Sequence, residues 1–263
     1  MPHRPGSSLP VVLVPLLLTA ALAGAEPIAP ADRRSSFDQM GAEIQAMQRD
    51  DSANPGMLAV ADGAELWTKP PMSGRTACAG CHGEASTSMR GVAARYPAWD
   101  ARTARPIDLQ DRVNACRREH QGADPLAYES PDLLALTAFV ATQSRGLPVA
   151  PPDDPRLASA RAEGRALFEA RQGQLGLSCA ICHDGNWGRR LGSAVIPQGH
   201  QTGYPLYRLE WQGLGSLQRR LRNCMTGMRA EPFGYGAPDY VALELYLASR
   251  AAPLPMETPA VRP

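Results

Sequence analysis

The amino-acid sequence predicts an all-α protein that consists of two similar halves. Stretches with the alternating apolar and polar pattern of β-strands are absent, whereas several stretches have helical character. The second half repeats the first at an offset of 101 to 108 residues. The 263 residues include 24 glycines and 25 prolines but only 6% aromatic residues. This composition indicates short helices joined by long loops, with few large side chains to fill a core.

The first 25 residues have the pattern of a secretory signal peptide. Arg4 provides a basic start, residues 11–23 are apolar, and Ala23-Gly24-Ala25 is typical of a cleavage site. The apolar run is short for a bilayer and contains Pro15, although an uncleaved anchor is the alternative interpretation. No other stretch is long enough to span a membrane. We therefore expect the mature protein in the periplasm, without a membrane span.

The rest of the chain divides into segments at a proline-rich linker. Four prolines occur within residues 148–155, and the segment before the first half contains a helical stretch around Phe37–Met47. The expected division is N-terminal extension 26–56, first domain 57–147, linker 148–155, second domain 156–252 and C-terminal tail 253–263.

Each half contains the same three helices in the same order. An aspartate lies near the start of each last helix, where negative charge is favourable for the helix dipole. The corresponding segments are 63–67 with 164–168, 109–116 with 217–224, and 131–143 with 238–250. This correspondence predicts two domains related by internal duplication.

A pentapeptide with two cysteines lies between the first and middle helices of each half. The copies are Cys78-Ala79-Gly80-Cys81-His82 and, 101 residues later, Cys179-Ala180-Ile181-Cys182-His183. Cys-x-x-Cys-His is the attachment pattern of a c-type haem, in which both cysteines form thioethers and the histidine binds the iron. A single copy would also fit a thioredoxin-like redox pair or half of a zinc site. Two copies in the same context predict two covalently bound haem c groups, and the order of elements resembles two class I cytochrome c domains.

Two cysteines remain, Cys116 and Cys224, at equivalent positions in the two middle helices. An oxidising compartment would permit a disulfide between them. Equivalent positions usually face the cofactor of their own domain, so we favour each as the distal ligand of its own haem, with His82 or His183 as the proximal ligand. A thiolate ligand would lower the reduction potential relative to methionine. Other possible distal ligands are His120 in the first half and His200, Met225 and Met228 in the second.

The segment around Cys224 is cationic. Arg220 lies four residues before Cys224 and therefore on the same face if the segment is helical. A guanidinium group at this place would be able to hold a sulfur oxyanion through two hydrogen bonds. Because Arg112 has the same relation to Cys116, an alternative role for either arginine is to hold a haem propionate.

These motifs resemble those of the SoxA family, the subunits of SoxAX cytochromes of sulfur oxidation. The most specific similarity is the run Arg220-Leu221-Arg222-Asn223-Cys224, followed by Met228-Arg229-Ala230-Glu231-Pro232. Leu243-Glu244-Leu245-Tyr246-Leu247 is also similar. The resemblance covers nearly the whole mature chain. Because the chain keeps Cys78, Cys81, His82 and Cys116, it resembles the dihaem members of the family.

The resemblance implies an activity and two protein partners. SoxA proteins act as L-cysteine S-thiosulfotransferases, which join thiosulfate oxidatively to a cysteine of the SoxYZ carrier protein, in a heterodimer with a smaller monohaem SoxX subunit. It implies that the second haem, held by Cys179, Cys182 and His183, is the catalytic one. It also implies that Cys224 is the distal ligand and can carry an extra sulfur, with Arg220 and Arg250 as active-site arginines. A vestige of duplication, a structural plug and an electron relay remain open as roles of the first haem.

Three other functions fit a dihaem protein: an electron carrier without substrate chemistry, a dihaem peroxidase and a scaffold subunit. Thiolate ligands disfavour the carrier because they lower the potential, and they disfavour the peroxidase because it needs an open distal position. The formal net charge of +1 gives no basic excess for nucleic-acid binding.

Overall fold

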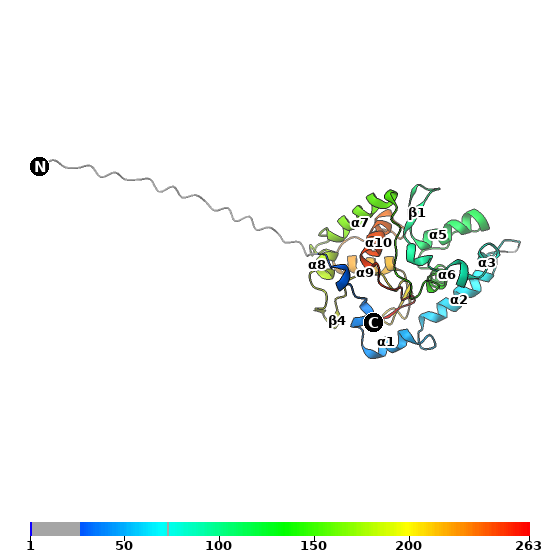
Figure 1. The fold of residues 1–263 in the computed structure, drawn as a ribbon, viewed down its shortest axis with the longest axis horizontal. Coiled ribbons are helices and arrows are strands. Elements are labelled where there is room, and N and C mark those ends of the chain that lie inside the picture. Colours follow the sequence, from blue (N-terminus) through cyan, green and yellow to red (C-terminus); the bar gives the residue numbers. More distant parts are fainter. Residues whose placement is uncertain (2–26, 73) are drawn as a thin grey trace.

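The computed structural model describes residues 27–72 and 74–263, together with Met1 (Figure 1). The predicted signal peptide lies outside the described residues apart from Met1. The described chain is mostly helical, and its strands are only two or three residues long. Among the described residues, no helix is long and apolar enough to cross a membrane.

Helix α1 (Ala42–Arg49) precedes the first half of the chain. Among its described residues, the first half contains five α-helices and one small antiparallel sheet. Its helices are α2 (Gly56–Thr68), α3 (Cys78–His82), α4 (Ala85–Ser88), α5 (Leu109–Cys116) and α6 (Pro131–Thr142). Strand β1 (Ala98–Asp100) pairs with β2 (Arg105–Ile107). A π-helical turn at Arg117–Gln121 directly follows α5.

The second half repeats this order with different sheets. Its helices are α7 (Ala158–Glu169), α8 (Cys179–His183), α9 (Leu217–Gly227) and α10 (Pro238–Ala251). Strands β3 (Arg190–Leu191) and β4 (Ala194–Val195) form a hairpin. A second sheet has the order β6 (Gly213–Gly215), β5 (Leu206–Arg208) and β7 (Val261–Arg262), in which β7 runs parallel to β5. Short 3₁₀-helices lie at Pro30–Asp32, Ser36–Gln39, Ala93–Arg95 and Pro155–Leu157.

The middle helices of the two halves begin at equivalent caps. The Asp108 carboxylate accepts a hydrogen bond from the backbone N–H of Asp111 at the start of α5, over 2.7 Å. The Ser216 hydroxyl, 108 residues later, accepts one from the backbone N–H of Arg219 at the start of α9, over 3.1 Å. Each cap satisfies an amide that has no partner within the helix. The three predicted pairs of helices are confirmed: the middle and last helices lie within three residues of their expected bounds, whereas α2 and α7 begin seven and six residues before the segments 63–67 and 164–168.

A glycine allows the same close helix crossing in both halves. A Cβ atom on Gly63 of α2 would overlap the carbonyl group of Ala135 in α6. A Cβ atom on Gly164 of α7 would overlap the carbonyl group of Ala242 in α10. Because glycine has no Cβ, the helix backbones approach more closely than any other residue would permit. The repeated crossing is structural support for the internal duplication.

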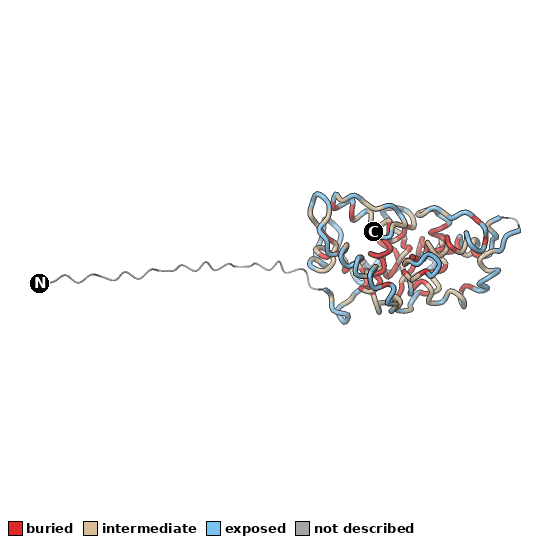
Figure 2. Tube along the Cα trace, turned by 90° about the horizontal axis from the view of Figure 1, so that it is seen from above, coloured by how far each residue is buried: buried red, intermediate tan, exposed pale blue. Residues whose placement is uncertain are grey.

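Each half has a buried cluster of its own, and the two halves also share a core between them. Helices α7, α8 and α10 lie on one side of the molecule and α2, α3, α5 and α6 on the other (Figure 1). One buried cluster combines Ala93, Ala141 and Val149 with Ala248 and Met256. Buried residues accordingly concentrate in the middle of the molecule (Figure 2).

The C-terminal tail is part of this core. The side chains of Thr258, Ala260 and Val261 are fully buried. The Val149 N–H donates a hydrogen bond to the carbonyl oxygen of Leu254 over 2.9 Å. The tail thus connects the linker region to β5, where it adds a parallel strand. The sequence did not predict these strands, because two or three residues are too few for a visible alternating pattern.

Candidate functional site

The second pentapeptide forms α8, and its histidine is held in one orientation. The Nδ1 atom of His183 donates a hydrogen bond to the carbonyl oxygen of Pro197 over 2.7 Å. This bond assigns the proton to Nδ1 and leaves Nε2 available as a metal ligand. Gly199, with φ of +75°, packs so closely against the ring that a Cβ atom there would lie 3.0 Å from it. The loop after α8 is therefore shaped to position the histidine ring.

A cavity of about 420 Å³ opens beside this histidine. It contains Cys179 of the pentapeptide together with His183 and Cys224. Its apolar wall consists of Phe168, Leu217, Leu221, Leu243 and Leu247. A thiol for a thioether, an imidazole nitrogen for iron and an apolar wall are what a covalently attached haem requires. The residues present therefore fit haem c at this position.

The structure brings Cys224 and His183 together across 41 residues of sequence. Burial alone would raise the pKa of the Cys224 thiol, but the neighbouring His183 and the charges of Arg220 and Arg208 outweigh burial and lower it. The sulfur is half-buried and lines the cavity. This position is suitable for the predicted ligand of the second haem, and it favours a thiolate.

Arg220 lines the same cavity, one helical turn before Cys224 on α9. Burial lowers the pKa of Arg220, but the nearby Cys224, Tyr204 and Glu210 outweigh burial and raise it. Within the described part of the chain, its guanidinium group forms no side-chain hydrogen bond. The guanidinium group thus remains available to an anion in the cavity.

The side chain of Arg250 bonds to partners other than Cys224. Arg250 Nη2 forms a buried ion pair with the Asp184 carboxylate over 2.6 Å and also donates to the carbonyl oxygen of Gln198 over 3.2 Å. Its guanidinium group lies 4.4 Å from the centre of the Phe168 ring. It is not among the residues that line the cavity. The sequence located Arg250 at the end of α10 correctly but did not indicate its partner Asp184, which directly follows His183.

The first pentapeptide has equivalent aromatic neighbours. Trp67 lies 5.7 Å from the His82 ring and 5.8 Å from Phe139, measured between ring centres. In the second half, Phe168 lies 6.4 Å from His183 and 5.4 Å from Tyr246. The repeated pair of rings places an apolar surface beside each proximal histidine, although His82 itself is exposed.

Cys116 of the first half also lies near its own pentapeptide. Burial raises the pKa of the Cys116 thiol, and the nearby Cys81 raises it further. Burial raises the pKa of Cys78 as well, with Cys116 a further influence. Cys116 is therefore close to the first pentapeptide and Cys224 to the second. This arrangement agrees with one ligand for each haem rather than a disulfide between the halves.

The other possible ligands are committed elsewhere or face solvent. His120 is largely exposed. Met225 and Met228 are buried against Tyr240 in an apolar cluster, where they have a packing role. His200 borders the cavity, but its Nε2 bonds to Gln198 Oε1 over 3.1 Å. Burial, followed by the nearby charge of Arg250, lowers the pKa of His200 to about 3.

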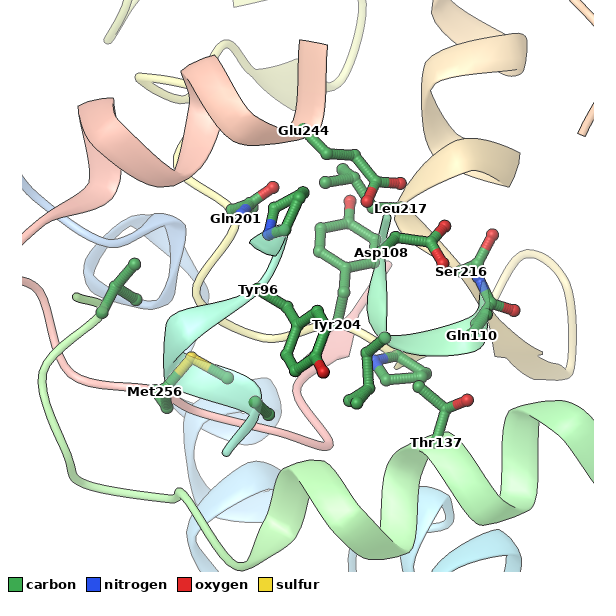
Figure 3. A pocket seen from close by; sticks show the side chains of 15 residues that line it. Tyr96, Asp108, Gln110, Thr137, Gln201, Tyr204, Ser216, Leu217, Glu244 and Met256 are labelled. Carbon is green, nitrogen blue, oxygen red and sulfur yellow. The ribbon is translucent and has the colours of Figure 1, made fainter. Parts of the chain in front are cut away.

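A second pocket lies between the two halves, and the sequence did not predict it. Its volume is about 80 Å³, and its polar lining includes Asp108, Gln110, Gln201, Ser216 and Glu244. Asp108 from the start of α5 and Glu244 from α10 point toward one another (Figure 3). This pocket shares Gln201, Tyr204 and Leu217 with the larger cavity. The two spaces are therefore neighbours that share part of their lining.

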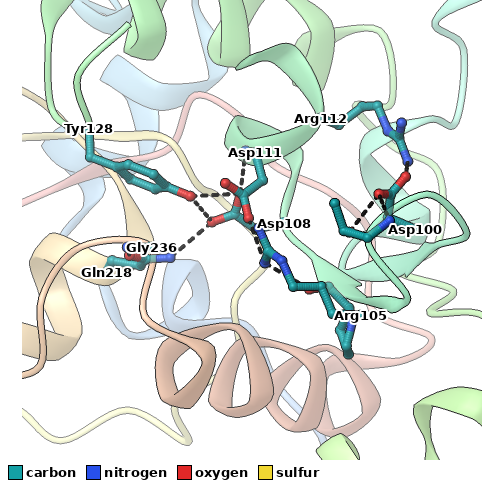
Figure 4. A network of polar contacts seen from close by, with 10 residues as sticks. Asp100, Arg105, Asp108, Asp111, Arg112, Tyr128, Gln218 and Gly236 are labelled. Atoms are coloured by element: carbon teal, nitrogen blue, oxygen red, sulfur yellow. Dashed lines mark hydrogen bonds and ion pairs between the residues drawn. The ribbon is translucent and has the colours of Figure 1, made fainter. Parts of the chain in front are cut away.

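Asp108 joins the halves through a network of hydrogen bonds (Figure 4). Its carboxylate accepts from Gln218 Nε2 over 2.9 Å and from the Tyr128 hydroxyl over 3.2 Å. Gln218 in turn accepts from the backbone N–H of Gly236 over 2.7 Å. Burial raises the pKa of Asp108 to about 7, with the Asp111 carboxylate adding to it, and burial beside Asp108 raises the pKa of Glu244 as well.

These buried acids predict a pH dependence of stability. Carboxyl groups of the unfolded chain ionise near pH 4, whereas Asp108 stays protonated in the folded protein until about pH 7. The contribution of Asp108 to the free energy of unfolding, roughly 2–4 kcal/mol, is therefore fully present below pH 4 and is lost as the pH rises toward 7. In Asp108→Asn, which can still cap α5, we expect the free energy of unfolding to fall less between pH 4.5 and 7.5. Urea unfolding of the haem-loaded protein tests this, with Asp132→Asn, an exposed substitution in α6, as control. If the free energy of unfolding changes equally with pH in Asp108→Asn and in the wild type, the prediction is wrong.

Comparison with known proteins connects this site to one family. The model of the SoxA/TsdA cytochrome c domain matches residues 62–149 and 163–256. The L-cysteine S-thiosulfotransferase subunit SoxA of Pseudaminobacter salicylatoxidans is 39% identical over 222 residues, which cover 84% of this chain and 78% of that protein. The subunit of the same name from Rhodovulum sulfidophilum is 37% identical over 229 residues, which cover 87% of this chain and 80% of that protein.

A solved structure is also similar. In the crystal structure of SoxXA from P. pantotrophus, a chain superimposes with a TM-score of 0.84 at 34% sequence identity. The match covers 88% of this chain and 87% of that chain. The fold and the two cytochrome c segments therefore agree between sequence and structure comparisons.

Proposed function

The chain belongs to the SoxA family of c-type cytochromes, and we propose that it joins thiosulfate oxidatively to a cysteine of a SoxYZ carrier protein. In this reaction one thiosulfate dianion and one cysteine thiol give a cysteine S-thiosulfonate, one proton and two electrons. A new sulfur–sulfur bond forms, and the sulfur atoms are oxidised. The electrons leave through haem to a partner cytochrome. The activity is that of an L-cysteine S-thiosulfotransferase.

The observation that carries this proposal is the position of Cys224. Its sulfur lies in one cavity with His183, Cys179 and the guanidinium group of Arg220. A passive electron carrier has no need for a sulfur ligand beside an unpaired cation, because thiolate lowers the potential. A sulfur beside a cation is instead suited to a substrate that is both a sulfur compound and a dianion.

Haem c is implied by the cytochrome c domain, and we propose two such groups. Cys179, Cys182, His183 and Cys224 would hold the second haem, and Cys78, Cys81, His82 and Cys116 the first. When bound, the second haem would supply a site that accepts electrons next to Cys224. For the first haem, the three roles named above stay open: a vestige of duplication, a structural plug or an electron relay.

The protein side chains prepare this site in three ways. Pro197 and Gly199 fix the ring of His183, and the apolar wall of the cavity limits water around Cys224. Arg220 would bind the sulfonate oxygens and stabilise their negative charge during the reaction. Because Arg250 is committed to Asp184 beside His183, we propose for it a positioning role on the histidine side.

The proposed partners and location follow from the family. We propose that the chain pairs with a SoxX-type monohaem subunit, acts on SoxYZ and works in the periplasm. The first of these is supported by the similar crystal structure, which is one of SoxXA. No step in the proposal involves nucleic acid or a membrane.

The proposal is tested by haem reduction. We expect thiosulfate to reduce the haem of the complex with its SoxX-type subunit only when SoxYZ is present. Reduction without SoxYZ, or none at all, would leave a simple electron carrier as the better description. Turnover of peroxide would indicate a peroxidase.

Arg220→Ala is expected to slow thiosulfate-dependent turnover at least tenfold, because one charge stabiliser of this kind contributes about 2–4 kcal/mol. The absorption spectrum of the haem should stay unchanged. Arg219→Ala is the control, since Arg219 lies next to Arg220 in sequence but contacts Trp211 with its guanidinium group. Equal rates for both variants would remove Arg220 from the mechanism.

A further inference from the structure

Four arginines line the cavity that contains Cys224, and two of them are occupied by other groups. The residues are Arg190, Arg208, Arg220 and Arg262. Arg262 pairs with Glu257 over 2.9 Å and donates further hydrogen bonds to Gln48 and to Ser36. Arg190 is exposed and donates to the carbonyl oxygen of Ser193 over 2.9 Å. Neither charge is therefore directed at Cys224.

Arg208 is the remaining cation, and no motif in the sequence pointed to it. The Arg208 guanidinium group pairs with Glu210 over 3.0 Å, but the Glu210 side chain is 63% exposed and so is screened by solvent. The Nε atom of Arg208 is buried, and no residue in the described part of the chain accepts a hydrogen bond from it. A buried donor without an acceptor is unfavourable unless a ligand or water satisfies it. Arg208 thus has unused hydrogen-bonding capacity beside the cavity.

Arg208, Arg220 and Cys224 line the same cavity. Burial lowers the pKa of Arg208, and the charge of Arg220 lowers it further. Two like charges at one cavity repel each other, and this repulsion is relieved when an anion lies between them. The arrangement is therefore complementary to a ligand with more than one negative charge.

The C-terminal strand holds Arg208 in this place. Tyr207 and Arg208 of β5 pair in parallel register with Val261 and Arg262 of β7. The backbone N–H of Tyr207 donates to the carbonyl oxygen of Ala260 over 2.8 Å. The position of Arg208 is thus fixed by backbone hydrogen bonds and does not depend on a flexible loop.

We propose that Arg208 and Arg220 together form a binding site for a dianionic sulfur substrate. They would bind its oxyanion end, while its sulfur atom reacts at Cys224. The inference rests on the proposed function and adds to it a substrate-binding residue on a different element of the fold. Arg220 approaches from α9 and Arg208 from β5, so the two guanidinium groups can contact different oxygens of one sulfonate group. Arg250, outside the cavity lining, has no part in this binding.

The same two cations would also suit a carboxylate of the haem itself. Both ligands are oxyanions, and an experiment must separate them. A substrate site affects the affinity for thiosulfate, whereas a propionate site affects the potential and the retention of haem.

The test uses Arg208→Gln and Arg208→Lys in the haem-loaded protein with its SoxX-type subunit. We expect Arg208→Gln to raise KM for thiosulfate about tenfold or more, as for the loss of a hydrogen bond to a charged group, and to change kcat less than threefold. Arg208→Lys should recover part of the affinity. Arg190→Gln is the control, because it removes the same charge from the rim of the same cavity. Sulfate, as an unreactive dianion, should become a correspondingly weaker inhibitor of Arg208→Gln.

Two results would overturn the inference. One is an unchanged KM in Arg208→Gln while Arg220→Ala is impaired, which would leave the proposed function intact. The other is a changed haem potential or loss of haem with an unchanged KM, which would assign Arg208 to a propionate. If the wild-type complex itself has no thiosulfate turnover, the proposed function fails. Calorimetric binding of thiosulfate to wild type and Arg208→Gln then decides the inference alone, and equal affinities would refute it.

Discussion

Replacement of Cys224 by serine is expected to lower thiosulfate-dependent turnover by about a hundredfold or more, on the scale seen when a reacting group is removed. A serine hydroxyl is nearly as large as the thiol, so the cavity keeps its shape. It cannot carry an added sulfur, and it is a weaker ligand for haem iron than a thiolate. The loss should therefore appear in kcat, with the fold preserved.

Electron paramagnetic resonance of the oxidised protein provides the second measurement for this variant. Two low-spin thiolate-ligated signals are expected in the wild type, and Cys224→Ser should change only one of them. Asn223→Ser is the control, since Asn223 is the adjacent exposed residue on α9. Turnover within threefold of wild type would show that Cys224 does not react, and unchanged signals from both irons would show that it does not bind iron.

Substitution of Gly164 by alanine is expected to destabilise the protein by about 3 kcal/mol, at the upper end of the range for overpacking. The added Cβ atom would overlap backbone atoms of Ala242 and Leu243 in α10. Backbone atoms cannot rotate away as a flexible side chain would, so α7 and α10 must move apart. This displacement also shifts Phe168, which packs near His183.

Thermal or urea unfolding of the haem-loaded protein measures this effect. Gly227→Ala is the matched control, because Gly227 is the last residue of α9 and a Cβ atom there would meet no other atom within 4 Å. We expect that control to stay within about 1 kcal/mol of wild type. If Gly164→Ala is equally stable, the close crossing is not a requirement of the fold.

The features that the sequence predicted well are local or repeated. Cys78–His82 and Cys179–His183 are continuous pentapeptides whose chemistry is contained in their spacing. The three helix pairs were recognisable because each occurs twice, and the structure gives them the same caps and the same glycine crossing. The domain bounds and the haem ligands stay predictions that experiment has to test.

The features that the sequence did not reveal depend on contacts between distant residues. Arg208 lies on a three-residue strand whose partner, β7, follows more than fifty residues later. Asp108 meets Gln218 across 110 residues, and no periodic pattern marks such a pair. For Arg250 the position along α10 was clear, but the direction of its side chain depends on Asp184 in another loop.

The contact between Asp108 and Gln218 has a consequence for how this molecule can be divided. Both groups are buried and bond to each other across the halves, so a fragment cut at residues 148–155 would lose this hydrogen bond and expose a broad apolar face. Such fragments should aggregate unless they are produced together. For the same reason, a chimera that combines halves of two relatives must take both members of this contact from one parent.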